Sequence, residues 1–322
     1  PPATETTQAA ATQSHIILAV GAPGEPEFGT NFLQQAALWQ QAAAGGPHRV
    51  TTVGLDDPPS RDDLLTLQDL LAAEPRHGSA PLWLVLIGHG TFDGRDARFN
   101  LRGPDLTATN LAERLRPFTR PLLVINTASS SAPFLPALAG TNRVTITATR
   151  SGHEQNFTRF GMHFARALTE TEADLDSDGQ VSLLEAFLRA WHGVAEFYKS
   201  EGRLATEHAL LDDTGDGLGT PGDWFRALRA TRRPRDNAPL DGLRAHQWHV
   251  RPSREEASLS PEAKLRRDAL ESRIAALRDR KTSMPEDAYY SELEAVLLEL
   301  SSLYPSADAA ANRPGGGAGT TP

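Results

Sequence analysis

The stretch LWLVLIGHG, residues 82–90, decides the fold that this sequence predicts. Its apolar residues follow one another without polar alternation, which is typical of a β-strand that is covered on both faces. The run ends abruptly at His89 and Gly90, where the glycine permits a sharp turn. A second apolar run, LLVINTASSS at residues 122–131, ends in small polar residues. Two such strands indicate a parallel sheet, and ligands bind such sheets at the carboxyl ends of the strands.

The remainder of the first two thirds of the chain repeats this alternation of strands and helices. The predicted strands are 15–20, 49–53, 82–88, 121–126 and 144–148, and the predicted helices between them are 30–43, 61–72, 110–116 and 134–139. Apolar residues then recur at helical spacing over 157–168 and 181–198. The order predicts the α/β class, with a doubly wound, mainly parallel sheet and helices on both faces.

The sequence divides into four parts. Residues 1–13 and 305–322 are small and polar, cannot bury apolar area, and are predicted to be disordered tails. Residues 14–233 are predicted to form the α/β domain. Residues 234–304 are predicted to form a helical extension, because 260–280 and 285–303 read as two helices of a hairpin.

Composition excludes several classes of protein. The net charge of −9 disfavours non-specific binding to nucleic acid. The absence of cysteine excludes disulfides, zinc held by thiolates and a thiol nucleophile. The apolar runs are too short for a membrane span, which needs ~18 residues or more. The charge and the cysteine count leave the oligomeric state open.

An aspartate-rich loop at residues 174–185 carries the most specific motif in the chain. It fits the twelve-residue EF-hand loop, with Gly179 at the sharp turn. Hard oxygen ligands in this number select Ca²⁺. The predicted ligands are Asp174, Asp176, Asp178, Gln180 (through its carbonyl), Ser182 and Glu185. The other interpretation, compatible with the first, is a capping box between Ser182 and Glu185. Residues 212–217 match the motif only in part, and their sequence favours a polar turn over a second metal loop.

The two strand ends together resemble the caspase-fold cysteine peptidases, on the legumain and gingipain side of that superfamily. The resemblance covers about residues 15–225. In those families a His-Gly pair supplies the catalytic base, and the next strand ends in Ala-Cys-x-Ser-Gly with cysteine as the nucleophile. His89 and Gly90 match the first element, residues 127–131 overlay the second, and 20–24 is similar to the first substrate-side loop. The resemblance implies that His89 lies beside the 126–131 turn.

The overlay places Ala128 where the family has its cysteine, and alanine has no atom that can attack a substrate. Three explanations stay open: a natural pseudo-peptidase, a Cys→Ala replacement that inactivates a peptidase, or a serine nucleophile among Ser129, Ser130 and Ser131. The last requires a hydroxyl within hydrogen-bond reach of His89. The other interpretation of these serines is a tight turn of small residues that caps the following helix.

The resemblance and the loop together predict a pseudo-peptidase that binds or scaffolds a peptide or protein partner and holds a structural Ca²⁺. The alternative is an active peptidase, either in a form with cysteine in place of Ala128 or through Ser129–Ser131. A small-molecule-binding α/β domain is disfavoured because no phosphate-binding glycine motif follows any strand. Because Ca²⁺ is plentiful outside cells, a periplasmic or secreted location is expected.

Overall fold

The computed structural model describes residues 13–56, 61–236 and 238–304, and two compact units make up the chain. The first unit is Pro1–Arg251 and the second is Pro252–Pro322. The boundary between the two units follows Arg251, whereas the sequence predicted a boundary after residue 233. The predicted tails, apart from residue 13, fall outside the described residues.

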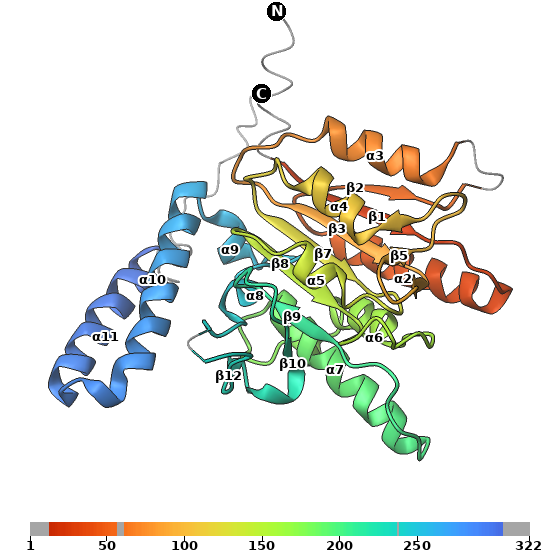
Figure 1. Ribbon diagram of the computed structural model, residues 1–322. Coiled ribbons are helices and arrows are strands. Elements are labelled where there is room, and N and C mark those ends of the chain that lie inside the picture. The colour runs from red at the N-terminus through yellow and green to blue at the C-terminus, as the bar shows by residue number, and fades with distance from the viewer. Residues whose placement is uncertain (1–12, 57–60, 237, 305–322) are drawn as a thin grey trace, which may run out of the picture. The chain divides into compact units, whose positions relative to one another are not determined.

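The first unit is built on a seven-stranded sheet with the order β10-β9-β8-β7-β3-β1-β2 (Figure 1). The five predicted strands all form, and they pair in parallel. They are β1 (Ser14–Val20), β2 (His48–Val53), β3 (Leu82–Ile87), β7 (Leu122–Asn126) and β8 (Arg143–Thr147). β9 (Leu210–Asp212) and β10 (Thr220–Pro221) add an antiparallel edge. The predicted mainly parallel sheet is confirmed.

Both faces of the central strands β1, β3 and β7 are buried, which explains their unbroken apolar runs. Successive side chains of a strand point to opposite faces. Ile16, Leu18 and Val20 of β1 accordingly join one apolar cluster, while Ile17 and Ala19 join another. A polar residue at any of these positions would lose its hydration without gaining a partner, so alternation is absent from the sequence.

Helices cover each of the two faces, as a doubly wound fold requires. One cluster contains side chains of α2 (Pro26–Ala43), α6 (Phe160–Ala167) and α7 (Leu183–Ser200). The other contains side chains of α3 (Asp63–Ala73), α4 (Ala108–Leu115) and α5 (Phe134–Ala137). Among the described residues, no helix combines the length and the apolar composition that a membrane crossing requires.

Short strands outside the central sheet have no counterpart in the sequence-based prediction. β4 (Gly90–Phe92), β5 (Ala97–Phe99) and β6 (Leu106–Thr107) form a small antiparallel sheet directly after His89. β11 (Phe225–Arg226) pairs with β12 (Arg229–Ala230). Strands of two or three residues contain too few positions to show a periodicity.

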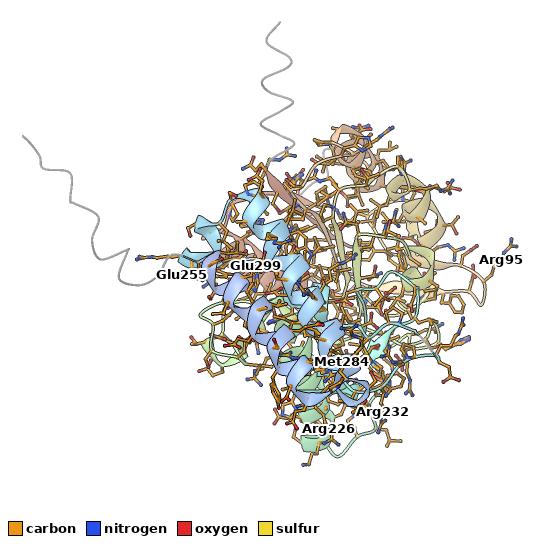
Figure 2. All side chains as sticks on the ribbon, turned by 90° about the vertical axis from the view of Figure 1, so that its left-hand side faces the viewer. Arg95, Arg226, Arg232, Glu255, Met284 and Glu299 are labelled. Carbon is orange, nitrogen blue, oxygen red and sulfur yellow. The ribbon has the colours of Figure 1, made fainter. Side chains whose placement is uncertain are left out.

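The second unit is the expected helical hairpin. It consists of α9 (Arg254–Ser258), α10 (Pro261–Arg280) and α11 (Glu286–Ser302). Ser260 caps α10 by accepting from the Ala263 amide. The two long helices bury a small core, and an ion pair between Arg266 and Glu299 links their surfaces. Figure 2 shows Glu299 on the exposed side of α11. The core residues are Leu270, Ile274, Leu277, Tyr289 and Val296.

A buried ion cluster lies at the amino end of the central strands, opposite the predicted ligand edge. Glu74 follows α3, and its carboxylate contacts His15 Nδ1 at 2.7 Å and Arg120 Nη1 at 3.0 Å. Arg49 also pairs with it, at 2.5 Å. Burial alone would raise the pKa of Glu74, but the hydrogen bond and charge of His15 and the two arginines outweigh burial and lower that pKa.

Glu74→Gln is expected to lower the free energy of unfolding by about 3 kcal/mol at pH 7, because it leaves the buried Arg120 without a compensating charge. A carboxyl whose folded-state pKa is depressed contributes stability above its ordinary pKa of 4.5, and this stability is lost as the pH falls through the folded-state value. Urea unfolding of both proteins at pH 7, 5 and 3 measures the difference. The exposed Glu113→Gln is the control, and equal effects of the two changes would contradict the assignment.

Candidate functional site

The parallel register brings three chain segments together at the carboxyl edge of the sheet. Val20 of β1 pairs with Ile87 of β3, and Leu86 of β3 pairs with Asn126 of β7. The loops that leave these three strands are therefore neighbours. They are the loops that the sequence singled out.

His89 lies between aromatic rings at this edge. Its imidazole packs edge-on against Phe28 and Phe32, with ring centroids 4.8 and 5.1 Å apart, and Phe157 is 6.1 Å away. Its Nε2 lies 3.2 Å from the carbonyl oxygen of Pro23. Because a carbonyl only accepts, Nε2 carries the hydrogen in this arrangement and Nδ1 is left as an acceptor. Burial lowers the pKa of His89, and the bond to Pro23 offsets only part of that effect.

The turn after β7 lies against the His-Gly pair, as the sequence predicted. Ser129 Oγ donates to the carbonyl of Gly90 at 2.9 Å and accepts from the amide of Gly90 at 3.1 Å. A Cβ at position 90 would lie 2.2 Å from the Ser129 carbonyl oxygen. Position 90 therefore requires glycine because the backbone of the turn after β7 approaches it closely. This requirement is separate from the conformational freedom that glycine gives a turn.

The turn does not present its side chains to solvent. Ala128 is 1% exposed and belongs to the apolar cluster beneath α3, α4 and α5. Ser131 bonds to Thr149, with the two oxygens 3.1 Å apart. Ser130 has a left-handed backbone, with φ of 53°, and its buried hydroxyl has no partner among the described residues. The hydrogen bonds of His89 and Ser129 run to backbone groups rather than to each other.

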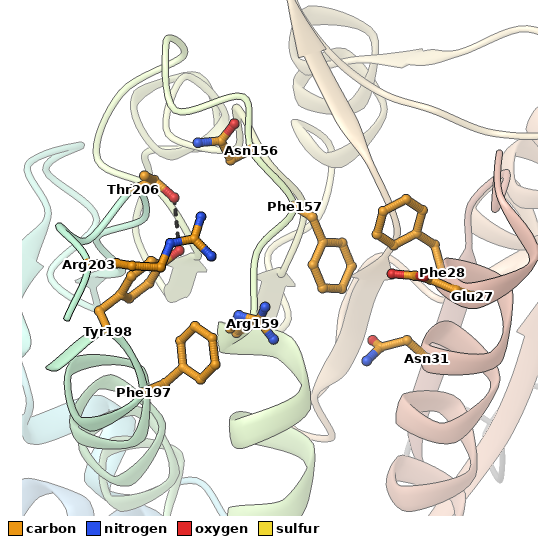
Figure 3. A pocket seen from close by; sticks show the side chains of 10 residues that line it. All are labelled: Glu27, Phe28, Asn31, Asn156, Phe157, Arg159, Phe197, Tyr198, Arg203 and Thr206. Carbon is orange, nitrogen blue, oxygen red and sulfur yellow. Dashed lines mark hydrogen bonds between the residues drawn. The ribbon is translucent and has the colours of Figure 1, made fainter. Parts of the chain in front are cut away.

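A pocket of about 420 Å³ lies near this edge of the sheet, and Figure 3 shows the side chains that line it. Phe28 and Phe157, which contact the imidazole, also form part of its wall. Three parts of the chain line it: Glu27, Phe28 and Asn31 of α2; Asn156, Phe157 and Arg159 before α6; and Phe197, Tyr198, Arg203 and Thr206 at and after the end of α7. Sequence reasoning missed Arg159 and Arg203, because no local motif joins these distant segments.

The predicted metal loop brings together three of its six proposed ligands. Carboxylate oxygens of Asp174, Asp176 and Glu185 lie within 4.8 Å of one another, and Glu185 is 1% exposed. Ser182 and Glu185 also form the predicted capping box at the start of α7. Gly179 has the expected left-handed conformation, with φ of 84°.

The other proposed ligands are arranged differently. Asp178 lies outside the group of three, and its carboxylate accepts from the main-chain and side-chain amides of Gln180. Burial raises the pKa of Asp176, and the charges of Asp178 and Glu185 raise it further. A cation at this point would relieve that repulsion.

A neighbouring segment lies along the acidic loop 174–185. Ser182 forms a β-bridge with His249, and the amide of Leu183 donates to the carbonyl of Trp248 at 2.8 Å. His246 Nε2 lies 3.5 Å from Asp176 Oδ2. The loop, which has no complete second EF-hand motif to pair with, therefore has a backbone partner after α8 (Leu243–His246).

The weaker aspartate loop is a closed turn. The carboxylate of Asp212 accepts from the amides of Gly215 and Gly217 at 2.7 and 2.9 Å. Asp213 accepts from backbone amides near the start of α8, and Asp241 accepts in turn from the Asp213 amide at 3.0 Å. These oxygens face backbone donors, which agrees with the polar-turn interpretation. Burial and the neighbouring Asp213 charge raise the pKa of Asp241 to about 8.

Two comparisons with known proteins, one with family models and one with curated proteins, gave no match. Among solved structures, the crystal structure of protein GSU0716 from Geobacter sulfurreducens is similar over 62% of this chain and 93% of that chain. The identity is 13% and the TM-score 0.42. A likeness at this level carries no information about function.

Ca²⁺ is expected to raise the melting temperature of the protein by roughly 5–10 °C at about 100 times its Kd, because an ion that binds the folded state stabilises it by mass action. Asp176→Ala combined with Glu185→Gln is expected to abolish the shift. The exposed Glu172→Gln is the matched control and keeps it. A melting curve unchanged by EDTA, with no heat of Ca²⁺ binding in calorimetry, would refute the metal site.

The contribution of Asp241 to stability is expected to fall as the pH rises between about 4 and 8, by up to about 1.4 kcal/mol per pH unit, because folded Asp241 retains a proton that the unfolded chain releases. Asp241→Asn should flatten this dependence. Urea unfolding at pH 5, 6, 7 and 8 measures both slopes. The exposed Asp216→Asn serves as the control, and an unchanged slope in Asp241→Asn would exclude a raised pKa at this position.

Proposed function

We propose that this chain is a caspase-like domain that binds a peptide or protein segment, lacks a working catalytic pair, and holds Ca²⁺ as a structural ion. One observation carries the proposal: His89, the Ala128–Ser129 turn and the Pro23 loop meet at one edge of the sheet, beside a pocket of about 420 Å³. Pockets of this size at such an edge are common binding sites in α/β proteins.

The geometry favours binding over hydrolysis. The Ala128 methyl is buried in an apolar cluster and offers no nucleophile. A serine nucleophile needs a base within ~2.6–3.2 Å of its hydroxyl. The Ser129 hydroxyl is instead bonded to both backbone groups of Gly90, and His89 Nε2 is directed at Pro23.

One observation favours the alternative that the chain is an active peptidase. Ser130 follows a central strand in a left-handed conformation, and its hydroxyl has no partner among the described residues. Strained serines on sharp turns after a strand serve as nucleophiles in other α/β hydrolases. Ser130 is 1% exposed, however, so a substrate would have to displace the turn to reach it.

The proposed Ca²⁺ site lies at the start of α7, whose far end lines the pocket. A bound ion would hold the carboxylates of Asp174, Asp176 and Glu185 together and fix that helix start. We assign the ion a structural role, and the oxygen-rich loop supports Ca²⁺ as the ion. The abundance of Ca²⁺ outside cells favours a periplasmic or secreted site of action. The net charge of −9 argues against a nucleic-acid partner.

Ala128→Cys is expected to give a slow-reacting thiol, at least 100-fold slower with iodoacetamide than an exposed one, because burial keeps a thiol protonated and covered. The chain has no other cysteine, so labelling reports this position alone. Ser79→Cys, at an exposed position, is the matched control. Fast labelling with new peptide hydrolysis would indicate an inactivated peptidase with an intact cleft. Cleavage by the unmodified chain that disappears in Ser129→Ala or Ser130→Ala would establish the serine alternative.

A further inference from the structure

Two buried aspartates lie where the end of β9 meets the start of α8 (Figure 1). Asp213 follows β9 directly, and Asp241 precedes Gly242, the N-cap of α8. Asp213 is 3% exposed and Asp241 is 4% exposed. A hydrogen bond joins their two carboxyl groups. Because an ionised carboxylate only accepts hydrogen bonds, one member of this pair carries a proton.

The surroundings of the pair disfavour a second negative charge. Burial raises the pKa of Asp213, and burial together with the charge of Asp213 raises the pKa of Asp241 to about 8. Asp212 adds a third negative charge beside Asp241, and the exposed Asp216 faces Asp212 in turn. Arg244 of α8 supplies a positive charge near Asp213. The pair therefore keeps its proton at neutral pH and loses it near pH 8.

The pair ties the first turn of α8 to the end of β9. The carboxylate of Asp213 accepts from the amides of Gly242 and Ala245 at 3.0 and 2.8 Å. Asp241 accepts from the Asp213 amide at 3.0 Å and from the Thr220 hydroxyl at 2.5 Å. A second charge in the pair would repel Asp241 from Asp213 and strain the bonds that fix α8.

The residues that follow this turn are the backbone partner of the acidic loop 174–185. The Leu183 amide donates to the Trp248 carbonyl at 2.8 Å. His246, at the end of α8, lies with its Nε2 3.5 Å from Asp176 Oδ2. A change at the start of α8 therefore reaches the acidic loop through a few residues of continuous chain.

Apolar anchors limit the size of this change. Ala245 and Val250 are 0% and 1% exposed and belong to the same apolar cluster as the buried face of α7. These anchors favour the packed position of the segment in both protonation states of the pair. The proton therefore shifts a local equilibrium between a packed and a loosened segment, and the rest of the domain stays folded.

We infer that the Asp213–Asp241 pair is a pH-dependent clamp on residues 241–250. With its proton the pair holds this segment against the acidic loop, and without the proton the segment loosens and the loop binds its ion less tightly. The effect on the ion rests on the proposed function, whereas the clamp itself does not.

The direction of the effect follows from linkage. A carboxyl whose pKa is raised in the packed state stabilises that state below the raised value, and the stabilisation is lost as the pH rises through it. Because coupling between two sites is reciprocal, an ion in the acidic loop raises the affinity of the pair for its proton. Ca²⁺ binding near pH 8 is therefore accompanied by proton uptake. An ion that displaces protons from its own ligands would release them instead.

Amide hydrogen exchange of the full chain tests the clamp without metal. After correction for the intrinsic effect of pH, protection of residues 242–250 is expected to fall about tenfold between pH 7 and pH 9, the ratio that one proton released near pH 8 allows. Protection of β3 should stay constant. Asp241→Asn should remove the pH dependence, because its amide is neutral and can still donate to Asp213. The exposed Asp216→Asn is the matched control and should behave like the parent chain.

A second variant guards against misfolding of the first. Thr220→Val keeps the shape of the buried side chain and removes a hydrogen bond that lowers the pKa of Asp241. It should move the midpoint of the exchange transition to higher pH. Melting curves establish that each variant is folded.

Calorimetric titration with Ca²⁺ at pH 7, 8 and 9 tests the link to the acidic loop. The parent chain is expected to bind at least threefold more weakly at pH 9 than at pH 7, and to take up protons at pH 8, measured in two buffers of different ionisation enthalpy. Asp241→Asn should show neither effect. Both proteins contain His246 and the loop carboxylates, so titration of those groups cancels in the comparison.

The outcomes separate this inference from the proposed metal site. If protection depends on pH and on Asp241 but no Ca²⁺ binds at any pH, the clamp stands and the metal site fails. If Ca²⁺ binds and protection of residues 242–250 is the same in the parent and in Asp241→Asn at both pH values, the metal site stands and the clamp is overturned. Equal Ca²⁺ affinity at pH 7 and pH 9, or proton release on binding, overturns the regulation of the loop by the pair.

Discussion

The rest of the structure depends on the parallel register of β1, β3 and β7. Leu18 pairs with Val85, and Val85 with Ile125, so the three strands end almost level. Because both faces of these three strands are buried, their polar side chains lie at the ends of the strands. The pairing of the strands therefore makes the Pro23 loop, His89 and the turn after β7 neighbours, whatever contacts their side chains form.

Helix α7 connects the two regions to which we assign a role. Its first turn contains the Ser182–Glu185 capping box of the acidic loop, and its last turn contributes Phe197 and Tyr198 to the pocket. Between these ends its apolar face packs into the same cluster as α2 and α6. An ion that fixes the beginning of this helix would thus stabilise a rigid element that extends to the pocket wall.

Sequence reasoning succeeded where the signal is local. The strands β1, β3 and β7 were evident because burial on both faces favours unbroken apolar runs, and the acidic loop was evident because its carboxylates lie within twelve residues. The pocket could not be foreseen, since its lining residues come from three segments of the chain that only the tertiary packing brings together. The burial of Ala128 could not be predicted either. Its sequence neighbours are polar, and its partners in the apolar cluster come from other parts of the chain.

The turn after β7 is closed by its own hydrogen bonds. Thr127 donates to the carbonyl of Leu86, Thr158 donates to that of Thr127, and Ser129 is bonded on both sides to Gly90. Freeing one such buried hydroxyl for a ligand costs about 1–3 kcal/mol. The polar groups of this turn therefore hold the sheet edge in place, and a ligand that used one of them would first have to break a buried hydrogen bond.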